Sequence, residues 1–488
     1  MSHNAFAKEN GHESVSNASD NRNGFREEWT EEEEKQALKQ LDLSLMTLLF
    51  VLYLLSYVDR SNLGSAFVAG MGRSWGITSN QYSWIIIVYY ITYPLGHVFI
   101  PLWKLFNLPL WVALMALGWG AMSMFQAATT NFAGMLVCRA LLGIFEAGFS
   151  PAVPLYLTFF YNKREMGLRY GLFLSAAPLA NSFATALAYG IVQARTALDG
   201  WQLLFVIEGL PTIVVALFTY HYLPNSPSEC HFLTARQNRI VHARSAKARG
   251  DAGAGKGAPL DPRLALAALR DPKCHAAAAL FFCCDIAFGS LPAYLPTMVR
   301  DMGFTAVNAQ GLSAPPYLVA FAACIGACLA SDRAQNRGAF LAACFCVGGA
   351  GFVVLAAVEV VALRYLAVFL VCAGVFAGIA LNCVWLTDNQ GGSTKRGVGL
   401  ALAGMVGHAG SVLGGFIFPA EEGPRYFRGM WICAGCMFLG ACTAMVLSLS
   451  LWLVNRRRDR LHGKSTIDDA PAEVETLGDG HPMYRYVL

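Results

Sequence analysis

Long apolar stretches recur along the chain and are separated by short polar segments. A helix needs about 20 mostly apolar residues to cross a bilayer, so this pattern predicts twelve membrane-spanning helices. The predicted spans are 41–64, 82–103, 108–128, 132–157, 169–192, 203–223, 274–298, 313–331, 339–358, 363–387, 398–419 and 430–454. Two of them are unusual, because the first contains Asp59 and Arg60 and the seventh contains Pro292 and Pro296. We therefore expect an all-α polytopic membrane protein.

The polar segments divide the chain into two groups of six predicted helices. The expected units are an N-terminal tail (1–40), a six-helix half (41–223), a linker (224–273), a second six-helix half (274–454) and a C-terminal tail (455–488). A weak repeat supports the division, since Gly-Ile-Thr at 76–78 and Gly-Phe-Thr at 303–305 follow the first helix of each half. Two such halves with a substrate site between them are typical of secondary transporters.

Composition excludes several other classes of protein. Of the 488 residues, 55% are hydrophobic and 14% are charged, whereas a soluble domain carries about 25% charged residues. The net charge of +4 is too small to indicate nucleic-acid binding. Most of the 14 cysteines lie in apolar runs without metal-ligand spacing, and no hydrolase motif is present. We expect neither an enzyme nor a bound metal or cofactor.

Positive charges in the loops predict the orientation of the helices. With the N-terminus inside, the short inner loops and the tail hold twelve lysines and arginines, against six outside. Cytosolic loops are the ones enriched in these residues. We expect a multi-pass protein, most consistent with the plasma membrane, whose two termini and linker are cytosolic.

Several motifs in order along the chain resemble those of a known family. They are YVDRSNLGSA at 57–66, RALLGIFEAGFSPA at 139–152, GWQLLFVIEG at 200–209, YLPNSP at 222–227 and TKRGVGLALAG at 394–404. The chain resembles the major facilitator superfamily, within it the anion:cation symporter family, and most narrowly the fungal allantoate/nicotinate permease-like transporters. The resemblance implies the major facilitator fold and proton-coupled symport of a small organic anion.

One loop departs from the superfamily pattern. The usual Gly-x-x-x-Asp-Arg motif between helices 2 and 3 is replaced by Pro-Leu-Trp-Lys at 101–104. The equivalent loop after helix 8 keeps Asp332, Arg333 and Arg337. With Arg169 in another inner loop, these three residues are the expected gating residues, in an asymmetric latch.

Four charged residues fall inside predicted spans: Asp59, Arg60, Arg139 and Glu146. Each would cost about 2.5–3.5 kcal/mol near the bilayer centre, so they must face a wet cavity or one another. Arg139 and Glu146 are two helical turns apart and share one face. The four residues form either a transport site or an ion-pair network that only joins two helices.

The charge balance suggests how such a site would couple protons to an anion. With both carboxylates ionised, the two arginines are neutralised, whereas protonation of one carboxylate leaves a positive site for an anion. Proton and anion would then stabilise each other's binding, as symport requires. The resemblance implies the same roles: Asp59 and Glu146 take protons, and Arg60 and Arg139 serve the substrate.

Further residues are candidates for lining the pocket. The substrate-contact candidates are Tyr57, Asn62, Tyr93, Trp385 and Asn389. Aromatic residues at helical spacing are also common packing residues, and Asn389 ends a helix, where gating or capping is equally open. Asp285 is either another proton site or a hydrogen-bonded structural residue. The membrane histidines His97 and His408 are expected to be packing residues.

Three functional alternatives remain open. The favoured function is uptake of a small organic anion driven by the proton gradient. Export of an organic acid or secondary metabolite uses the same cycle in reverse, and a nutrient-sensing receptor would bind substrate with little transport. The expected partners are the anion, protons and the lipid bilayer, with no nucleic acid, and we expect a monomer.

Overall fold

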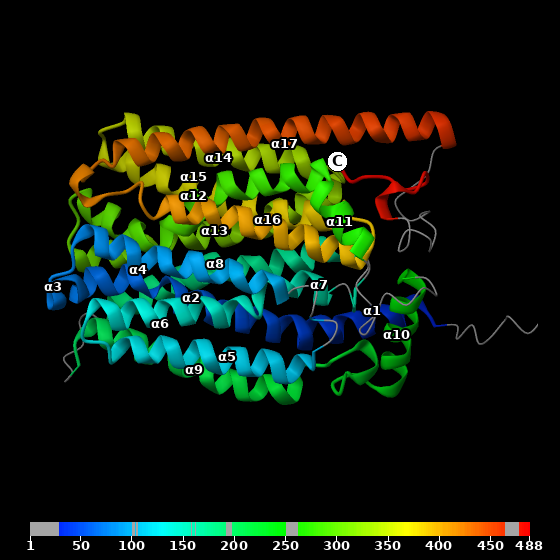
Figure 1. Cartoon of the computed structure of the whole chain (residues 1–488), viewed down its shortest axis with the longest axis horizontal. Coiled ribbons are helices and arrows are strands. Elements are labelled where there is room, and N and C mark those ends of the chain that lie inside the picture. Colours follow the sequence, from blue (N-terminus) through cyan, green and yellow to red (C-terminus); the bar gives the residue numbers. More distant parts are fainter. Residues whose placement is uncertain are drawn as a thin grey trace, which may run out of the picture.

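The structure is a computed structural model that describes residues 29–99, 103, 106–157, 159–161, 163–191, 198–249, 262–463 and 478–488. Within these ranges the chain forms helices and turns and no strand. The long helices run alongside one another in a single bundle, with α17 along one edge and α9 along the opposite edge (Figure 1). The predicted all-α membrane architecture is therefore confirmed.

The first half begins with a helical stretch from Glu31 to Trp75 that is kinked at Gly70, whose φ is 114°. It comprises α1 (Glu31–Leu41), a π-helical turn η1 (Asp42–Met46), α2 (Thr47–Ala66), a second π-helical turn η2 (Phe67–Met71) and α3 (Gly72–Trp75). The elements that follow are α4 (Ser79–Thr92), η3 (Tyr93–Phe99), α5 (Leu108–Ala127), α6 (Phe132–Ala147), η5 (Ser150–Ala152), α7 (Val153–Leu157), α8 (Lys163–Ile191) and α9 (Gly200–Tyr222).

The connecting segment and the second half are also helical. The connection contains η6 (Pro227–Glu229), α10 (Ala235–Arg249) and α11 (Pro262–Arg270). The second half contains α12 (Pro272–Asp301), α13 (Ala306–Ala334), α14 (Arg337–Ala357), α15 (Val361–Asp388), α16 (Ser393–Gly414), η7 (Ala420–Glu422), α17 (Phe427–His462) and η9 (Gly478–Gly480).

Eleven of the described helical segments are long and apolar enough to cross a membrane, and they coincide with eleven predicted spans. The remaining predicted span, 82–103, corresponds to α4 and η3, and part of its end lies outside the described residues. Pro292 and Pro296 do not interrupt α12, which is continuous. The predicted span 132–157 is instead broken after α6, where Gly148 ends the helix.

The repeat noted at 76–78 and 303–305 is a helix stop followed by a helix start. Gly76 and Gly303 have φ of 63° and 106°, a backbone conformation that favours glycine and ends the preceding helix. Thr78 then caps α4 and accepts a hydrogen bond from the Gln81 N–H, and Thr305 caps α13 in the same way. The two halves therefore share a local signal that turns the chain back into the bundle.

The two halves meet along four helix pairs. These pairs are α8 with α13, α8 with α15, α2 with α12, and α4 with α16. Inside the halves, α5 packs on α9, and α14 packs on α15 and α17. We call the end of the bundle that carries α1, α10 and residues 478–488 the terminus side, and the end that carries α3 the far side (Figure 1).

Helices α1 and α10 pack on the terminus side of the first half through ion pairs. Arg236 of α10 lies 3.3 Å from a Glu33 carboxylate oxygen of α1. Arg244 pairs with Glu34 at 2.6 Å and also with Glu165 at the start of α8. The segment 478–488, in contrast, is hydrogen-bonded to α14, α15 and α17 of the second half. Each half thus carries its own attachment on the same side.

Candidate functional site

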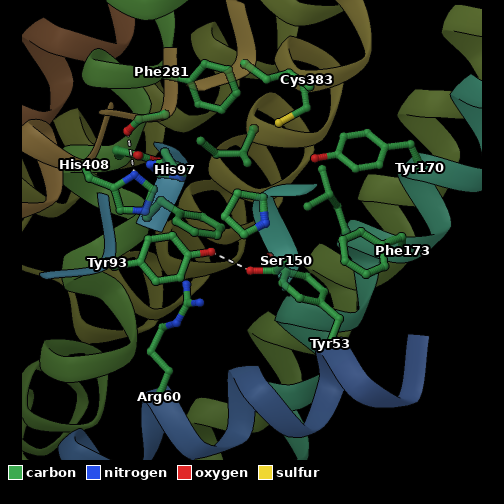
Figure 2. Close-up of a pocket in the computed structure, with 17 residues that line it drawn as sticks. Tyr53, Arg60, Tyr93, His97, Ser150, Tyr170, Phe173, Phe281, Cys383 and His408 are labelled. Carbon is green, nitrogen blue, oxygen red and sulfur yellow. Dashed lines mark hydrogen bonds between the residues drawn. The ribbon is translucent and has the colours of Figure 1, made fainter. Parts of the chain in front are cut away.

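A cavity lies between the two halves, and Arg60 borders it (Figure 2). It lies on the terminus side of Arg60, because its lining includes Tyr53, which precedes Arg60 on α2, and Tyr170 near the start of α8. Its wall combines residues of both halves, as expected for a site between them. Its lining includes Tyr53, Arg60, Tyr93, His97, Ser150, Tyr170, Phe173, Phe281, Asp285, Phe288, Ile379, Cys383, Leu400, Gly404 and His408. These residues come from α2, η3, η5, α8, α12, α15 and α16, so most of the helices that line the interface contribute.

Arg60 and Glu146 form the central ion pair of the site. The Arg60 Nη2 and Nε atoms lie 2.8 and 3.2 Å from Glu146 Oε2. The same oxygen accepts hydrogen bonds from the Ser56 hydroxyl at 3.0 Å and the Tyr89 hydroxyl at 2.9 Å. Glu146 Oε1 is buried and has no hydrogen-bond partner among the described residues. Protein groups therefore bind the carboxylate through Oε2, whereas Oε1 accepts no hydrogen bond from a described residue.

Three tyrosine rings surround the Arg60 guanidinium. Its central carbon lies 4.9 Å from the ring centroids of Tyr57 and Tyr89 and 5.0 Å from that of Tyr93. Ring faces attract a cation electrostatically, most strongly where water is excluded. The side chain of Arg60 rises from α2 toward Tyr93 and Ser150 in Figure 2. The rings therefore hold the charge in place without neutralising it.

Arg139 lies beside this pair but lines a different, smaller cavity. Its Nη1 donates a hydrogen bond of 2.9 Å to the Arg60 carbonyl. The Nε and Nη2 atoms are buried and have no partner among the described residues. The smaller cavity also includes Arg60, Tyr90 and Gly289, so Arg60 borders both cavities. An edge formed by Nε and Nη2 has the geometry that binds a carboxylate with two hydrogen bonds.

Asp59 is separated from the other three charges. Its Oδ2 accepts a hydrogen bond of 2.7 Å from Thr212 of α9, and it lines neither of the two cavities. Glu208 lies one turn before Thr212 on the same face of α9 and is also buried. The four charges therefore do not share one surface: Arg60, Arg139 and Glu146 gather, whereas Asp59 faces between α2 and α9.

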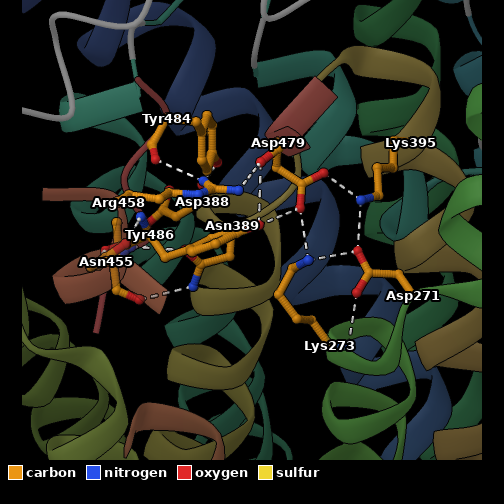
Figure 3. Close-up of polar contacts among 11 residues, drawn as sticks. Asp271, Lys273, Asp388, Asn389, Lys395, Asn455, Arg458, Asp479, Tyr484 and Tyr486 are labelled. Atoms are coloured by element: carbon orange, nitrogen blue, oxygen red, sulfur yellow. Dashed lines mark hydrogen bonds and ion pairs between the residues drawn. The ribbon is translucent and has the colours of Figure 1, made fainter. Parts of the chain in front are cut away.

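Four of the five substrate-contact candidates do not line the central cavity, and two of these four lie at the end of α15. The Trp385 Nε1 and Asn389 Nδ2 atoms each donate a hydrogen bond of 2.9 Å to the Val487 carbonyl. Asn389 Oδ1 accepts the Val487 N–H at 2.8 Å. Their position at the terminus-side end of α15 explains this, because segment 478–488 folds back onto that end (Figure 3). Asn62 is buried near the site, and its side-chain atoms have no described partner.

An ion-pair ring fixes the segment 478–488. Lys273 contacts Asp271 at 2.8 Å and Asp479 at 2.7 Å, and Lys395 contacts Asp271 at 2.6 Å and also pairs with Asp479 (Figure 3). Burial by itself would raise the pKa of Asp479, but the ammonium groups of the two lysines outweigh it and lower the pKa to about 2. The segment is thus held by charge as well as by backbone hydrogen bonds.

The gating candidates lie near the terminus side. Arg337 bridges Asp332 at 2.7 Å and Asp388 at 2.6 Å. Gly167 of the other half lies against this network, and a Cβ there would fall 2.3 Å from Asp332 Oδ1. Arg169 donates two hydrogen bonds to Asp42, at 2.7 and 2.8 Å. Arg333 is exposed and not part of the network.

Close contacts between the halves also occur on the far side, and the sequence pattern does not predict them. The Tyr82 hydroxyl donates to the Ala293 carbonyl at 3.1 Å, and the Ser65 hydroxyl donates to Gln310 at 3.0 Å. A Cβ on Gly64 would lie 2.4 Å from the carbonyl oxygen of Pro292. The backbones of α2 and α12 therefore touch here, and this closes the bundle beyond Arg60.

Two histidines that the sequence presents as separate meet in the cavity. His97 of η3 and His408 of α16 belong to different halves, and their ring centroids are 5.3 Å apart. Tyr93 stacks on His408 with a centroid distance of 4.8 Å. Their separation of more than 300 positions in the sequence hid this contact, since no local pattern connects them. Asp285 lines the same cavity. Among the described residues there is no group of three or more potential metal ligands.

Known proteins resemble this chain in sequence and in fold. The model of the Major Facilitator Superfamily matches residues 49–415. The chain is 32% identical over 436 residues to the MFS-type transporter efuF of Hormonema carpetanum, with 87% of each chain covered. It is 28% identical to the high-affinity nicotinic acid transporter of Saccharomyces cerevisiae, over 93% of this chain and 85% of the relative. The structure of the proton:xylose symporter XylE superposes with a TM-score of 0.69 at 15% identity, over 89% of this chain and 98% of XylE.

Proposed function

Since this chain belongs to the major facilitator superfamily of membrane transporters, we propose that it carries a small organic anion across a fungal membrane together with protons. One observation carries the proposal. A guanidinium, that of Arg60, borders the central cavity and is neutralised by a single carboxylate, that of Glu146. An anionic substrate can take the place of that carboxylate once Glu146 is protonated.

The arrangement of Glu146 supports it as the proton-binding group. All four hydrogen bonds to this carboxylate reach Oε2, so Oε1 can accept a proton without the loss of a protein contact. Protonation removes the negative charge and weakens the hydrogen bonds that Arg60 donates. The guanidinium keeps its three tyrosine rings and gains an open direction toward the cavity. Proton and anion therefore favour each other at this site.

We propose different roles for Arg139 and Asp59. Arg139 offers its unpaired Nε and Nη2 edge to an anion in the smaller cavity on the far side of Arg60. Asp59 is bonded to Thr212 outside both cavities, so it is a second proton carrier that acts through helix packing rather than through substrate contact. The substrate would then meet Arg139 and Arg60 in turn on its way through the protein.

We take nicotinic acid as the first transport probe, because the relative from Saccharomyces cerevisiae carries that name. The purified protein is reconstituted into vesicles, and uptake of labelled nicotinic acid and of other labelled monocarboxylates is measured with and without an imposed proton gradient. We expect gradient-driven accumulation that a protonophore abolishes. Uptake that is the same with and without the gradient would contradict proton coupling. Uptake of neutral sugars alone would contradict the proposal that the substrate is an anion.

The proposed orientation in the membrane follows from the distribution of lysines and arginines in the loops. The terminus side, with α1, α10 and the 478–488 segment, is placed in the cytosol, because the loops of that side carry most of the lysines and arginines. We place the protein in the plasma membrane as a monomer. In this orientation the central cavity lies on the cytosolic side of Arg60.

A further inference from the structure

We infer that the central cavity selects organic acids that carry an N–H or O–H donor on an apolar body, at the end opposite the carboxylate. The inference rests on the proposed function and adds a substrate class to it. It comes from groups that the proposed mechanism does not use: Asp285, the His97–His408 pair and the aromatic wall. Together these groups give the cavity a second pole.

The first pole donates hydrogen bonds. Arg60 has only N–H groups to offer, and the neighbouring cavity wall supplies no other cation from the described lining. A substrate carboxylate is therefore oriented with its oxygens toward α2.

The second pole accepts hydrogen bonds. His408 Nδ1 lies 2.7 Å from the Gly404 carbonyl, which can only accept, so Nδ1 carries the proton. In the neutral ring Nε2 is then a lone-pair acceptor. The Asp285 carboxylate makes no side-chain hydrogen bond or ion pair within the described residues, although it borders the cavity. His408 Nε2 and the Asp285 carboxylate can therefore each accept a hydrogen bond from a substrate.

Tyr93 lies next to both poles, and this limits the distance between them. Its ring centroid lies 5.0 Å from the Arg60 guanidinium carbon and 4.8 Å from the centroid of His408. Arg60 and His408 are therefore no farther apart than these two distances together, which is the scale of a small ring compound. His97 supports His408 from the other half, with 5.3 Å between the ring centroids. Asp285 lies beside His408, because its Oδ2 would be only 2.9 Å from a Cβ on Gly407, the residue before His408.

The wall between the poles is apolar and largely aromatic. Tyr53 stacks on Phe173 with a centroid distance of 4.3 Å, and Phe288 lies 5.1 Å from Phe376. Phe281 completes this wall next to Cys383 (Figure 2). A flat apolar body fits such a surface, whereas a polyhydroxylated one would lose hydrogen bonds to water.

The two poles make specific demands on the substrate. A donor opposite the carboxylate satisfies His408 or Asp285, and an acid without a donor leaves these acceptors unpaired after water is displaced. A second carboxylate at that end would face the charge of Asp285. The cavity therefore favours amino or hydroxy acids over unsubstituted acids and over dicarboxylates of the same length. Nicotinate, whose ring nitrogen carries no proton at neutral pH, is expected to bind like an unsubstituted acid.

Three probes of one shape test the inference: benzoate, 4-hydroxybenzoate and terephthalate. Their binding to the purified full-length chain is measured by thermal stabilisation over a concentration series, independently of transport. We expect 4-hydroxybenzoate to bind roughly tenfold more tightly than benzoate, as one hydrogen bond to an otherwise unpaired acceptor provides. Terephthalate should bind most weakly.

Two variants locate the effect. His408→Phe keeps a ring to stack on Tyr93 and removes the acceptor, and Asp285→Asn removes the negative charge. The first should bring the two monocarboxylates to within about twofold of each other, and the second should improve terephthalate binding. His275→Phe is the matched control, because His275 is exposed at the start of α12, outside the cavity.

The outcomes separate this inference from the proposed function. Equal binding of benzoate and 4-hydroxybenzoate by the unmodified chain, or an unchanged ratio in His408→Phe, would overturn the two-pole site and leave anion transport standing. An Asp285→Asn protein that loses proton coupling without any change in probe preference would make Asp285 a proton site instead. Failure of all carboxylates to stabilise the chain would overturn the proposed function itself.

Discussion

Arg60 donates two hydrogen bonds to one oxygen of Glu146, Oε2, and leaves the other oxygen without a partner. The pair joins α2 to α6 inside the first half, so it can open and close without separating the two halves. A purely structural ion pair would gain from the use of both carboxylate oxygens. The one-sided geometry instead leaves a position for a proton next to the cavity.

Replacement of Glu146 by glutamine should uncouple transport from the proton gradient. Glutamine keeps the shape of the side chain but cannot release a proton, so the site stays in its anion-binding form. We expect Glu146→Gln to exchange labelled for unlabelled nicotinic acid in counterflow, while accumulation driven by an imposed gradient falls at least about tenfold. Full accumulation by this variant would assign coupling to Asp59 or Asp285.

Asp59→Asn is the informative companion to that experiment. Because Asp59 is bonded to Thr212 outside the cavities, its loss should reduce the transport rate and leave the affinity for the anion close to that of the parent. The comparison uses the same vesicles and the same labelled probe. A large loss of affinity in Asp59→Asn would mean that the carboxylate reaches the substrate in another conformation.

A lysine at position 139 should not support substrate binding as Arg139 does. The guanidinium spans a hydrogen bond to the Arg60 carbonyl and an unpaired edge, and an ammonium group cannot reproduce both. We expect Arg139→Lys to weaken the apparent affinity for the transported acid by about tenfold or more, with normal yield in the membrane. Concentration-dependent uptake measures this directly. Near-parental affinity would restrict Arg139 to holding α6 against α2.

Alanine at Gly64 should open the far side. A Cβ there meets the Pro292 and Ala293 carbonyls, which are backbone atoms and cannot move aside. Reaction of an introduced Ser83→Cys with an impermeant reagent, in a cysteine-depleted chain, should increase several-fold in Gly64→Ala. Gly190→Ala is the control, because no described atom outside its own stretch of helix lies within 4 Å of its Cβ position. Unchanged reactivity would show that the far-side contact is not the closed gate.

Attachment of the 478–488 segment should depend on pH only in acid. The pKa of Asp479 is about 2 when the segment is docked and about 3.9 when it is free, so the carboxylate favours docking at neutral pH. This contribution, about 2–3 kcal/mol, is complete above pH ~5 and is lost as the pH falls toward 2. Hydrogen exchange of residues 478–488, corrected for the intrinsic rate, should show it.

Asp479→Asn should reproduce the acid effect at neutral pH. The variant leaves Lys273 and Lys395 to share the single carboxylate of Asp271. Protection of the segment should fall while that of α12 stays high. Equal protection in both proteins would show that the Trp385 and Asn389 hydrogen bonds are sufficient to hold the segment.

The orientation is testable with a single introduced cysteine. Ala235 is exposed at the start of α10, on the terminus side. In a cysteine-depleted chain, Ala235→Cys should react with an impermeant thiol reagent only after the cells are permeabilised. A reaction on intact cells would invert the proposed topology.

The sequence predicted the helices well because the bilayer imposes a strong and local signal. Each described long helix corresponds to an apolar run, and the repeated Gly-x-Thr signal marks a helix start in both halves. The break after α6 was missed, since Gly148 lies in an otherwise apolar stretch and only packing decides that the helix ends there.

The site was predictable only where charge and spacing are local. Arg139 and Glu146 sit on one face of α6 as their spacing indicates. Asp59 was placed with them, but it sits one position from Arg60 and therefore points in another direction around α2. Two other contacts join segments that are far apart in the sequence, so no local pattern predicts them. His97 packs against His408, and Trp385 donates a hydrogen bond to the Val487 carbonyl.

The attachments on the terminus side make the motion of the protein measurable from outside the membrane. Ion pairs fix α10 to the first half, and segment 478–488 is bonded to the ends of α14, α15 and α17. A fluorophore on each of these two elements would therefore travel with its own half. The energy transfer between them would report the opening angle of the transporter in real time, with no label in the cavity or in contact with lipid.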